Sequence, residues 1–215
     1  MTSNNAIVFI DGNNFYHNIN FMRIKASHID FKKLSEAVCS HFNVVWKGTR
    51  YYNSVPNLED NKEIYWKHMK FLKEVEQLPN FEVITRKLQK HSTKEILQEK
   101  NQLINSLGLC NKCQPLVETN CNDCVGAFKM REKGIDVKIA IDMVEFALKN
   151  KCDCIILVSG DADLIPALKV AEENKKIAYS VFLRSGYSFH LRDEFKYLIM
   201  GNEFIKSNCL KDGIV

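Results

Sequence analysis

Short apolar runs that end in polar turns recur along this chain and predict β-strands. Ala6–Ile10 and Cys154–Ser159 are the clearest, and each is followed at once by an aspartate and a glycine. A short, continuous apolar run is typical of a strand that is buried on both faces, as in a parallel sheet. The same pattern predicts further strands at 44–52, 81–88 and 178–183.

Between these runs, apolar residues recur at the three- and four-residue spacing of amphipathic helices. Asp136–Asn150 shows this spacing best, and Asp30 is a suitable N-cap for a helix over 30–41. The other predicted helices cover 60–78, 163–174 and 188–200. Because strands alternate with helices, we predict a three-layer α/β fold with a mostly parallel central sheet.

The composition agrees with the predicted α/β fold and indicates a soluble protein. The 215 residues are 46% apolar and 26% charged, which suits one soluble domain, 1–215, with a small insertion. No run approaches the roughly 18 apolar residues that span a bilayer, and Met1–Asn5 lacks the features of a secretory signal. We therefore expect no membrane partner and a cytoplasmic location. The net charge of +4 is compatible with a nucleic-acid partner without requiring one.

Four aspartates stand where strands end or helices begin: Asp11, Asp136, Asp161 and Asp163. In an open α/β sheet, ligands bind in the crevice outside the carboxyl ends of the strands. Carboxylates gathered there repel one another unless a cation lies between them, and Mg²⁺ or Mn²⁺ prefers oxygen ligands. Any one of these residues alone is more often a turn or cap residue, but four together predict a metal-dependent phosphoryl-transfer site.

Three neighbouring residues are candidates to support this site. Asn14 and Ser159 could each orient a water or a phosphate oxygen. Asp142 lies about 120° around the predicted helix from Asp136, so the two cannot both point squarely at one ion. Asp142 is therefore either a supporting acid or a solvent-facing one.

Four of the eight cysteines form the pattern CxxC-x7-CxxC within the predicted insertion, 106–128; they are Cys110, Cys113, Cys121 and Cys124. Two such pairs can supply four thiolates to a tetrahedral Zn²⁺ ion. Four thiolates leave no open coordination position, so this zinc would be structural. Disulfides or free thiols are the alternative interpretation, and disulfides are rare where thiols are kept reduced.

Three blocks carry a family resemblance: Ile10-Asp-Gly-Asn-Asn14, the stretch Lys133–Asp142 and Ser159-Gly-Asp-Ala-Asp-Leu164. They resemble the signature blocks of the NYN domain, a PIN-like nuclease group that includes the LabA-type proteins, and the resemblance covers nearly the whole chain. It implies a Rossmann-like PIN fold and metal-dependent ribonuclease activity. It also maps the acidic site onto the same four aspartates, with Asp142 as a further matching acid, and makes a homodimer possible.

The resulting hypothesis is a ribonuclease that cuts RNA, expected to be single-stranded, with Mg²⁺ or Mn²⁺ in the acidic site. The alternative is a non-catalytic RNA- or protein-binding module that keeps the acidic pocket. A phosphatase of the Asp-x-Asp type is disfavoured, because Asn13 stands two residues after Asp11. The basic stretch 86–94 could face a nucleic-acid backbone, and Tyr16 or His17 could be exposed for base stacking.

Overall fold

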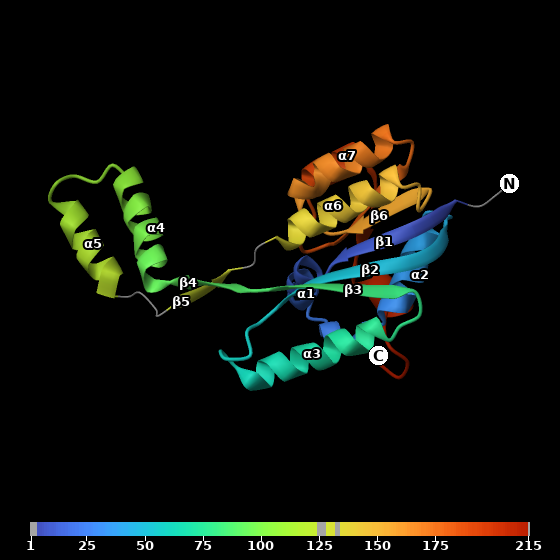
Figure 1. Ribbon diagram of the computed structural model, residues 1–215, viewed down its shortest axis with the longest axis horizontal. Helices are drawn as coiled ribbons and strands as arrows, with labels where there is room; N and C mark the ends of the chain where they lie inside the picture. Colours follow the sequence, from blue (N-terminus) through green and yellow to red (C-terminus); the bar gives the residue numbers. More distant parts are fainter. Residues whose placement is uncertain (1–3, 124–127, 132–133, 215) are drawn as a thin grey trace. The chain divides into compact units, whose positions relative to one another are not determined.

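The computed structural model describes residues 4–123, 128–131 and 134–214, without the side chains of 89–93, 121–123 and 128–131. The chain forms two compact units. The larger unit contains Met1–Arg86 and Gly134–Val215, and the smaller unit is Lys87–Lys133. Figure 1 shows the elements of both.

A six-stranded sheet in the order β3-β2-β1-β6-β7-β8 organises the larger unit. The strand pairs β1–β2, β1–β6, β6–β7 and β7–β8 are all parallel, which confirms the predicted α/β fold. The strands are β1 (Asn5–Asp11), β2 (Val45–Val55), β3 (Phe81–Lys87), β6 (Cys154–Val158), β7 (Ile177–Leu183) and β8 (Lys196–Met200). Ile10 pairs with Val158 and Asp11 pairs with Tyr52, so the ends of β1, β2 and β6 meet at one edge.

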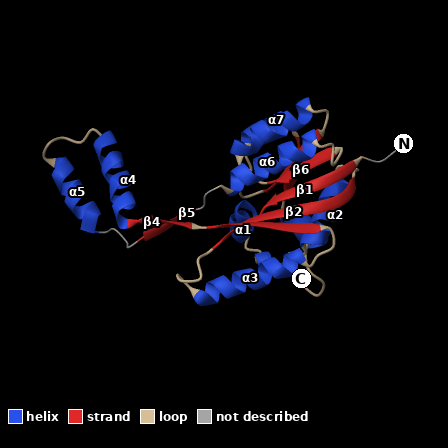
Figure 2. Cartoon of the chain, in the orientation of Figure 1, coloured by secondary structure: helices blue, strands red, loops and turns tan. Residues whose placement is uncertain are grey.

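Helices cover both faces of this sheet, and Figure 2 shows their alternation with the strands. One face carries α1 (Gly12–Phe21), α2 (Phe31–His41), α3 (Lys62–Glu76) and α9 (Asn202–Asn208), with the short turn η1 (Ala26–His28) between α1 and α2. The other face carries α6 (Ile135–Leu148), α7 (Ile165–Glu173) and α8 (Phe189–Glu194), with η2 (Ala162–Leu164) leading into α7.

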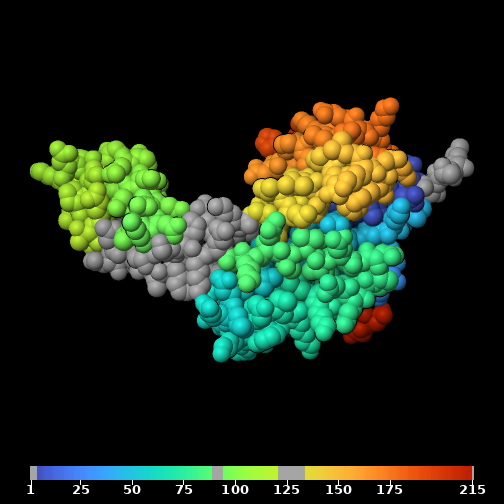
Figure 3. All heavy atoms as spheres, viewed as in Figure 1, coloured from blue at the N-terminus to red at the C-terminus, as the bar shows by residue number. Residues whose placement is uncertain are grey.

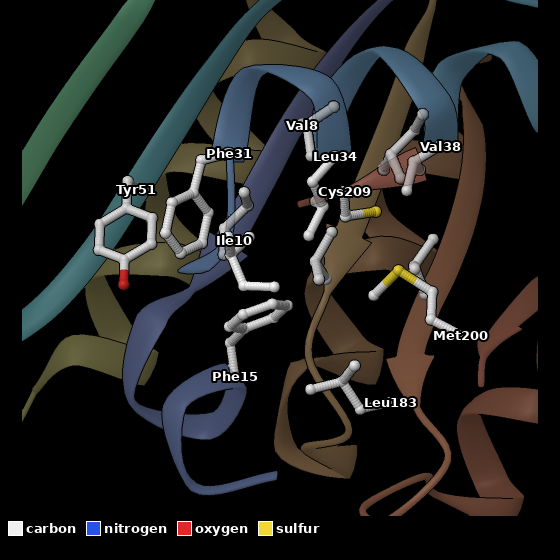
Figure 4. Packing of buried hydrophobic residues seen from close by; sticks show 14 of the residues in the cluster. Val8, Ile10, Phe15, Phe31, Leu34, Val38, Tyr51, Leu183, Met200 and Cys209 are labelled. Atoms are coloured by element: carbon white, nitrogen blue, oxygen red, sulfur yellow. The ribbon is translucent and has the colours of Figure 1, made fainter. Parts of the chain in front are cut away.

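The two hydrophobic cores follow from the alternation of side chains along β1. Val8 and Ile10 enter the core shared with α1 and α2, shown in Figure 4, whereas Ile7 and Phe9 enter the core shared with α6 and α7. Because both faces of β1 are covered, its sequence is continuously apolar rather than alternating.

The smaller unit contains an antiparallel strand pair and two helices. Gln89 of β4 (Gln89–Ser92) pairs with Arg131 of β5 (Phe128–Arg131). The helices α4 (Thr93–Ser106) and α5 (Cys113–Asp123) pack against each other, and Ile104 is buried. The predicted insertion, 106–128, lies inside this unit.

The predicted helix over 188–200 is wrong in its second half, since α8 ends at Glu194 and Lys196–Met200 is the strand β8. Leu191, Phe195 and Leu198 are buried and stand four and three residues apart, which imitates a helical face. The strand alternation appears at its end instead, where Leu198 and Met200 enter one core while Ile199 between them packs against the other, and Leu198 pairs with Val181. The helix α1, which the sequence analysis did not predict, begins directly after β1.

Candidate functional site

The Asp11 carboxylate connects the ends of β1 and β6. It is only 4% exposed and caps α1, because its Oδ1 atom accepts a hydrogen bond from the Asn14 backbone N–H at 3.0 Å. Its Oδ2 atom accepts from the Ser159 hydroxyl at 3.0 Å, and that hydroxyl oxygen accepts from the Asp161 backbone N–H at 3.2 Å. Three of the predicted site residues are therefore joined directly.

Asn14 is part of the same network. Its Oδ1 atom accepts from the Gly160 backbone N–H at 3.1 Å and from the Asn18 side-chain amide at 3.0 Å. These contacts fix α1 against the loop that follows β6. The structure thus places Asn14 beside Asp11, while its role toward water or phosphate stays a prediction.

Close packing explains two of the glycines in the site motifs, Gly12 and Gly160. A Cβ atom on Gly160 would lie 1.7 Å from the carbonyl oxygen of Gly186, and one on Gly12 would lie 2.6 Å from the Tyr52 carbonyl oxygen. Neither position has room for a larger residue. Asp161 is consequently held where two loops pass each other closely, and Asp11 where the start of α1 packs against β2.

Asp163 and Asp136 belong to neighbouring elements at this edge. The Asp163 backbone N–H donates to Asp161 Oδ1 at 2.9 Å, while its own side chain is exposed. Asp136 stands in the first turn of α6, a helix that packs against η2, and the preceding Gly134 has a positive φ of 84°. The four aspartates offer oxygen donors suited to a hard cation. As the side chains stand, however, no three metal-ligating groups converge within the described residues.

Asp142 is occupied by a different network. It is 2% exposed, and its Oδ1 atom accepts from the Lys138 ammonium at 2.6 Å. Its Oδ2 atom accepts from the Tyr52 hydroxyl at 2.9 Å and from the Arg50 guanidinium at 3.1 Å. Burial raises the pKa of Tyr52 far above its ordinary value, so the hydroxyl stays protonated and donates. Arg50 also pairs with Glu82 of β3.

These contacts tie α6 to β2 and β3, and they favour a supporting role for Asp142. A catalytic role for Asp142 stays a prediction. The sequence analysis did not identify Arg50 or Tyr52, which reach Asp142 across 90 or more residues of chain. The spacing of Lys138 and Asp142, four residues apart on one helix, was the available signal for part of this network.

The described geometry does not support the predicted zinc site. Cys110 and Cys113 are exposed, while Cys124 and the side chain of Cys121 lie outside the described residues. Cys113 and Cys121 stand eight residues apart on α5, which separates them by about 12 Å along the helix axis. Thiolates on one zinc each lie about 2.3 Å from the ion, so a shared ion would require α5 to unwind between these cysteines.

Cys110 is expected to react first with iodoacetamide among the six cysteines whose side chains the structure describes. The backbone N–H groups of Cys113 and Lys112, together with the Cys113 thiol, lower the pKa of the Cys110 thiol. The thiolate is the reacting species, so Cys110 gains reactivity near neutral pH. Burial raises the pKa of Cys39 to about 12 and that of Cys154 to about 11, so these thiols should stay protected. Mass-spectrometric mapping of timed alkylation tests this order. Equal labelling of Cys110 and Cys39 in folded protein would contradict it.

The rim near Asp11 carries the expected aromatic residue. Tyr16 is 53% exposed on α1, and His17 beside it is exposed as well, which agrees with the prediction for these two residues. From the basic stretch 86–94, Arg86 and Lys94 are exposed, whereas the side chains of Lys90 and His91 lie outside the described residues. No helix in the part of the chain that the structure describes is long and apolar enough to cross a membrane.

Comparison with known proteins adds a family, one curated relative and one solved structure. The model of the NYN domain family matches residues 5–200. An uncharacterized protein of Methanocaldococcus jannaschii, MJ0482, is 32% identical over 77 residues, which cover 35% of this chain and 32% of that protein. The match thus spans about a third of that relative's length.

The solved structure shows the fold alone. It is the crystal structure of a protein of unknown function, VPA0982, from Vibrio parahaemolyticus, with a TM-score of 0.54 and 16% sequence identity. The alignment covers 97% of each chain.

Proposed function

Because the chain belongs to the NYN domain family, whose fold is generally that of PIN-like nucleases, we propose that it is a metal-dependent ribonuclease. The observation that carries the proposal is the hydrogen-bonded cluster of Asp11, Ser159 and Asp161 at the carboxyl ends of β1 and β6. This is the edge where open α/β sheets bind their ligands.

The residues of this edge have distinct tasks under the proposal. Asp11, Asp161, Asp163 and Asp136 would hold Mg²⁺ or Mn²⁺. The bound ions would supply a nucleophilic water near neutral pH and charge neutralisation on the scissile phosphate. Ser159 orients the Asp11 carboxylate through its hydroxyl hydrogen bond, and Asn14 keeps α1 and the Gly160 loop together. The substrate we propose is single-stranded RNA.

A cleavage assay with end-labelled single-stranded RNA tests this function. We expect cutting with Mn²⁺ or Mg²⁺ and none with EDTA, because under the proposal the metal ions would supply the nucleophilic water and neutralise the phosphate. A matched DNA oligonucleotide in parallel reports whether the 2′-hydroxyl is needed. Cutting that continues unchanged in EDTA would contradict a metal-dependent mechanism.

The second candidate is an RNA- or protein-binding module without turnover. It is favoured by one observation, that within the described residues no three metal-ligating side chains converge. RNA that is bound equally well in EDTA and stays intact with every metal would support this candidate over the nuclease.

A further inference from the structure

A pocket beside the candidate site is chemically suited to a nucleobase. It has a volume of about 340 Å³ and lies between α1, η1 and α3. Its lining residues are Tyr16, Asn20, Lys25, Ala26, Ser27 and Phe71. This volume is at the lower end of the range for small-molecule pockets, which suits one nucleoside rather than a larger ligand.

The lining combines aromatic rings with free polar groups. Tyr16 is 53% exposed and Phe71 is half-buried, so both rings can contact a flat ligand. Asn20, Lys25 and Ser27 are exposed, and their side chains make no hydrogen bond or ion pair with any other described residue. An aromatic face, an amide with both donors and an acceptor, and a lysine are the groups that recognise an unpaired base and its phosphate.

The position of the pocket links it to the acidic site. Asp11 caps α1, and Tyr16 stands five residues later on the same helix, about 7.5 Å along the axis. Five residues also turn the helix by about 140°, so an RNA strand whose phosphate lies at Asp11 would bend around the start of α1 to bring a neighbouring base to Tyr16.

A second groove, between α3 and β3, is larger but less suited. It has a volume of about 550 Å³ and includes Trp66, Lys70 and Lys73 (Figure 3 shows α3 in teal against β3 in green). However, β2 lies between β3 and β1, so β3 stands two strand spacings, about 10 Å, from the strand that ends at Asp11. Glu76 in its lining also offsets the charge of one of the two lysines.

We infer that the pocket between α1, η1 and α3 binds one unpaired base of single-stranded RNA next to the scissile phosphate, an inference that rests on the proposed function. The base stacks on Tyr16, Asn20 contacts its hydrogen-bonding edge, and Lys25 lies against the adjacent phosphate. The pocket thereby selects unpaired over base-paired RNA, because a paired base cannot leave its helix without losing its partner.

Binding measurements on a non-cleaving background test the inference. Fluorescence anisotropy of a labelled short RNA is measured with Asp11→Asn protein and with the same protein carrying Tyr16→Ala, Tyr16→Phe or Phe21→Ala. We expect Tyr16→Ala to weaken binding about 5- to 150-fold, the loss associated with one stacked base. Tyr16→Phe keeps the ring and should bind like its parent. Phe21, which is 77% exposed on the same helix but does not line the pocket, is the matched control.

An abasic scan of the RNA identifies the base. With the parent protein, removal of a base should weaken binding at one position of the RNA only. With Tyr16→Ala, removal of the base at that position should weaken binding no further. Equal binding by Tyr16→Ala and its parent, or equal abasic losses with both, would overturn the inference.

Three outcomes show whether the pocket inference, its assignment to RNA or both proposals fail. If wild-type protein cuts RNA and Tyr16→Ala still binds it as its parent does, the pocket inference alone fails. If a nucleoside monophosphate binds in a Tyr16-dependent way as tightly as the RNA does, the pocket holds free nucleotides and the assignment to RNA is wrong. Protein that neither binds nor cuts single-stranded RNA overturns both proposals.

Discussion

Asp11→Asn is expected to reduce RNA cleavage at least about 10²- to 10³-fold, the scale of loss when one electrostatic group leaves an active centre. The substitution removes the negative charge that would bind the metal, yet it preserves the shape of the side chain. Asparagine is as good a helix N-cap as aspartate, so its oxygen can still accept from the Asn14 backbone N–H. The fold should therefore survive while cleavage is lost.

Single-turnover cleavage at saturating Mn²⁺ measures this effect, and thermal unfolding of the same samples checks the fold. Asp161→Asn should behave in the same way. Asp193→Asn is the matched control, because this aspartate is 65% exposed on α8 and pairs only with its neighbour Arg192 in the described structure. Cleavage by Asp11→Asn at the wild-type rate would exclude a mechanism through this carboxylate.

Local sequence was sufficient to predict the part of the site that lies at strand ends. A continuously apolar run identifies a strand buried on both faces, and in a parallel sheet the residues after two such runs meet at one edge. For this reason Asp11, Ser159 and Asp161 could be placed together from sequence, and the structure joins them by hydrogen bonds. The identification of the family rested on these same segments.

Contacts between residues that are far apart in the sequence could not be predicted in this way, because they depend on strand register and on how the elements pack. The contact of Arg50 with Asp142 depends on which residue of β2 faces α6, and no local pattern fixes that choice. The strand β8 was missed because three buried residues at helical spacing outweighed a weak alternation. The pocket at Tyr16 is formed by α1, η1 and α3, of which α1 was not predicted.

The cysteine pattern shows what spacing alone leaves open. Spacing alone favoured four thiolates on one zinc, but spacing says nothing of the backbone between the two pairs. In the structure the residues from Cys113 onward form α5, and a helix keeps residues eight apart on separate turns. A motif therefore predicts a shared ion only where the intervening chain can fold back.

The second large effect concerns stability. Asp142→Ala is expected to lower the free energy of unfolding by about 3–5 kcal/mol, the cost of removing one partner from a buried ion pair. Arg50, whose side chain is 13% exposed, and Lys138 would keep their charges without this carboxylate, and the Tyr52 hydroxyl would lose its acceptor. Since total stability is usually about 5–15 kcal/mol, urea unfolding should show a large decrease in midpoint.

Glu145→Gln on the same helix is the matched control. Glu145 pairs with Lys149 and Lys151 at the surface, and exposed ion pairs contribute little to stability, so its replacement should leave the urea midpoint nearly unchanged.

Cleavage assays then separate two roles for Asp142. If Asp142 fixes α6, the more conservative Asp142→Asn should lose stability while the Mn²⁺ concentration for half-maximal cleavage stays the same in the protein that remains folded. If stability is unchanged and cleavage is abolished, Asp142 is instead one of the catalytic acids. A residue whose only role is to fix α6 would loosen this helix, which carries Asp136, when it is replaced.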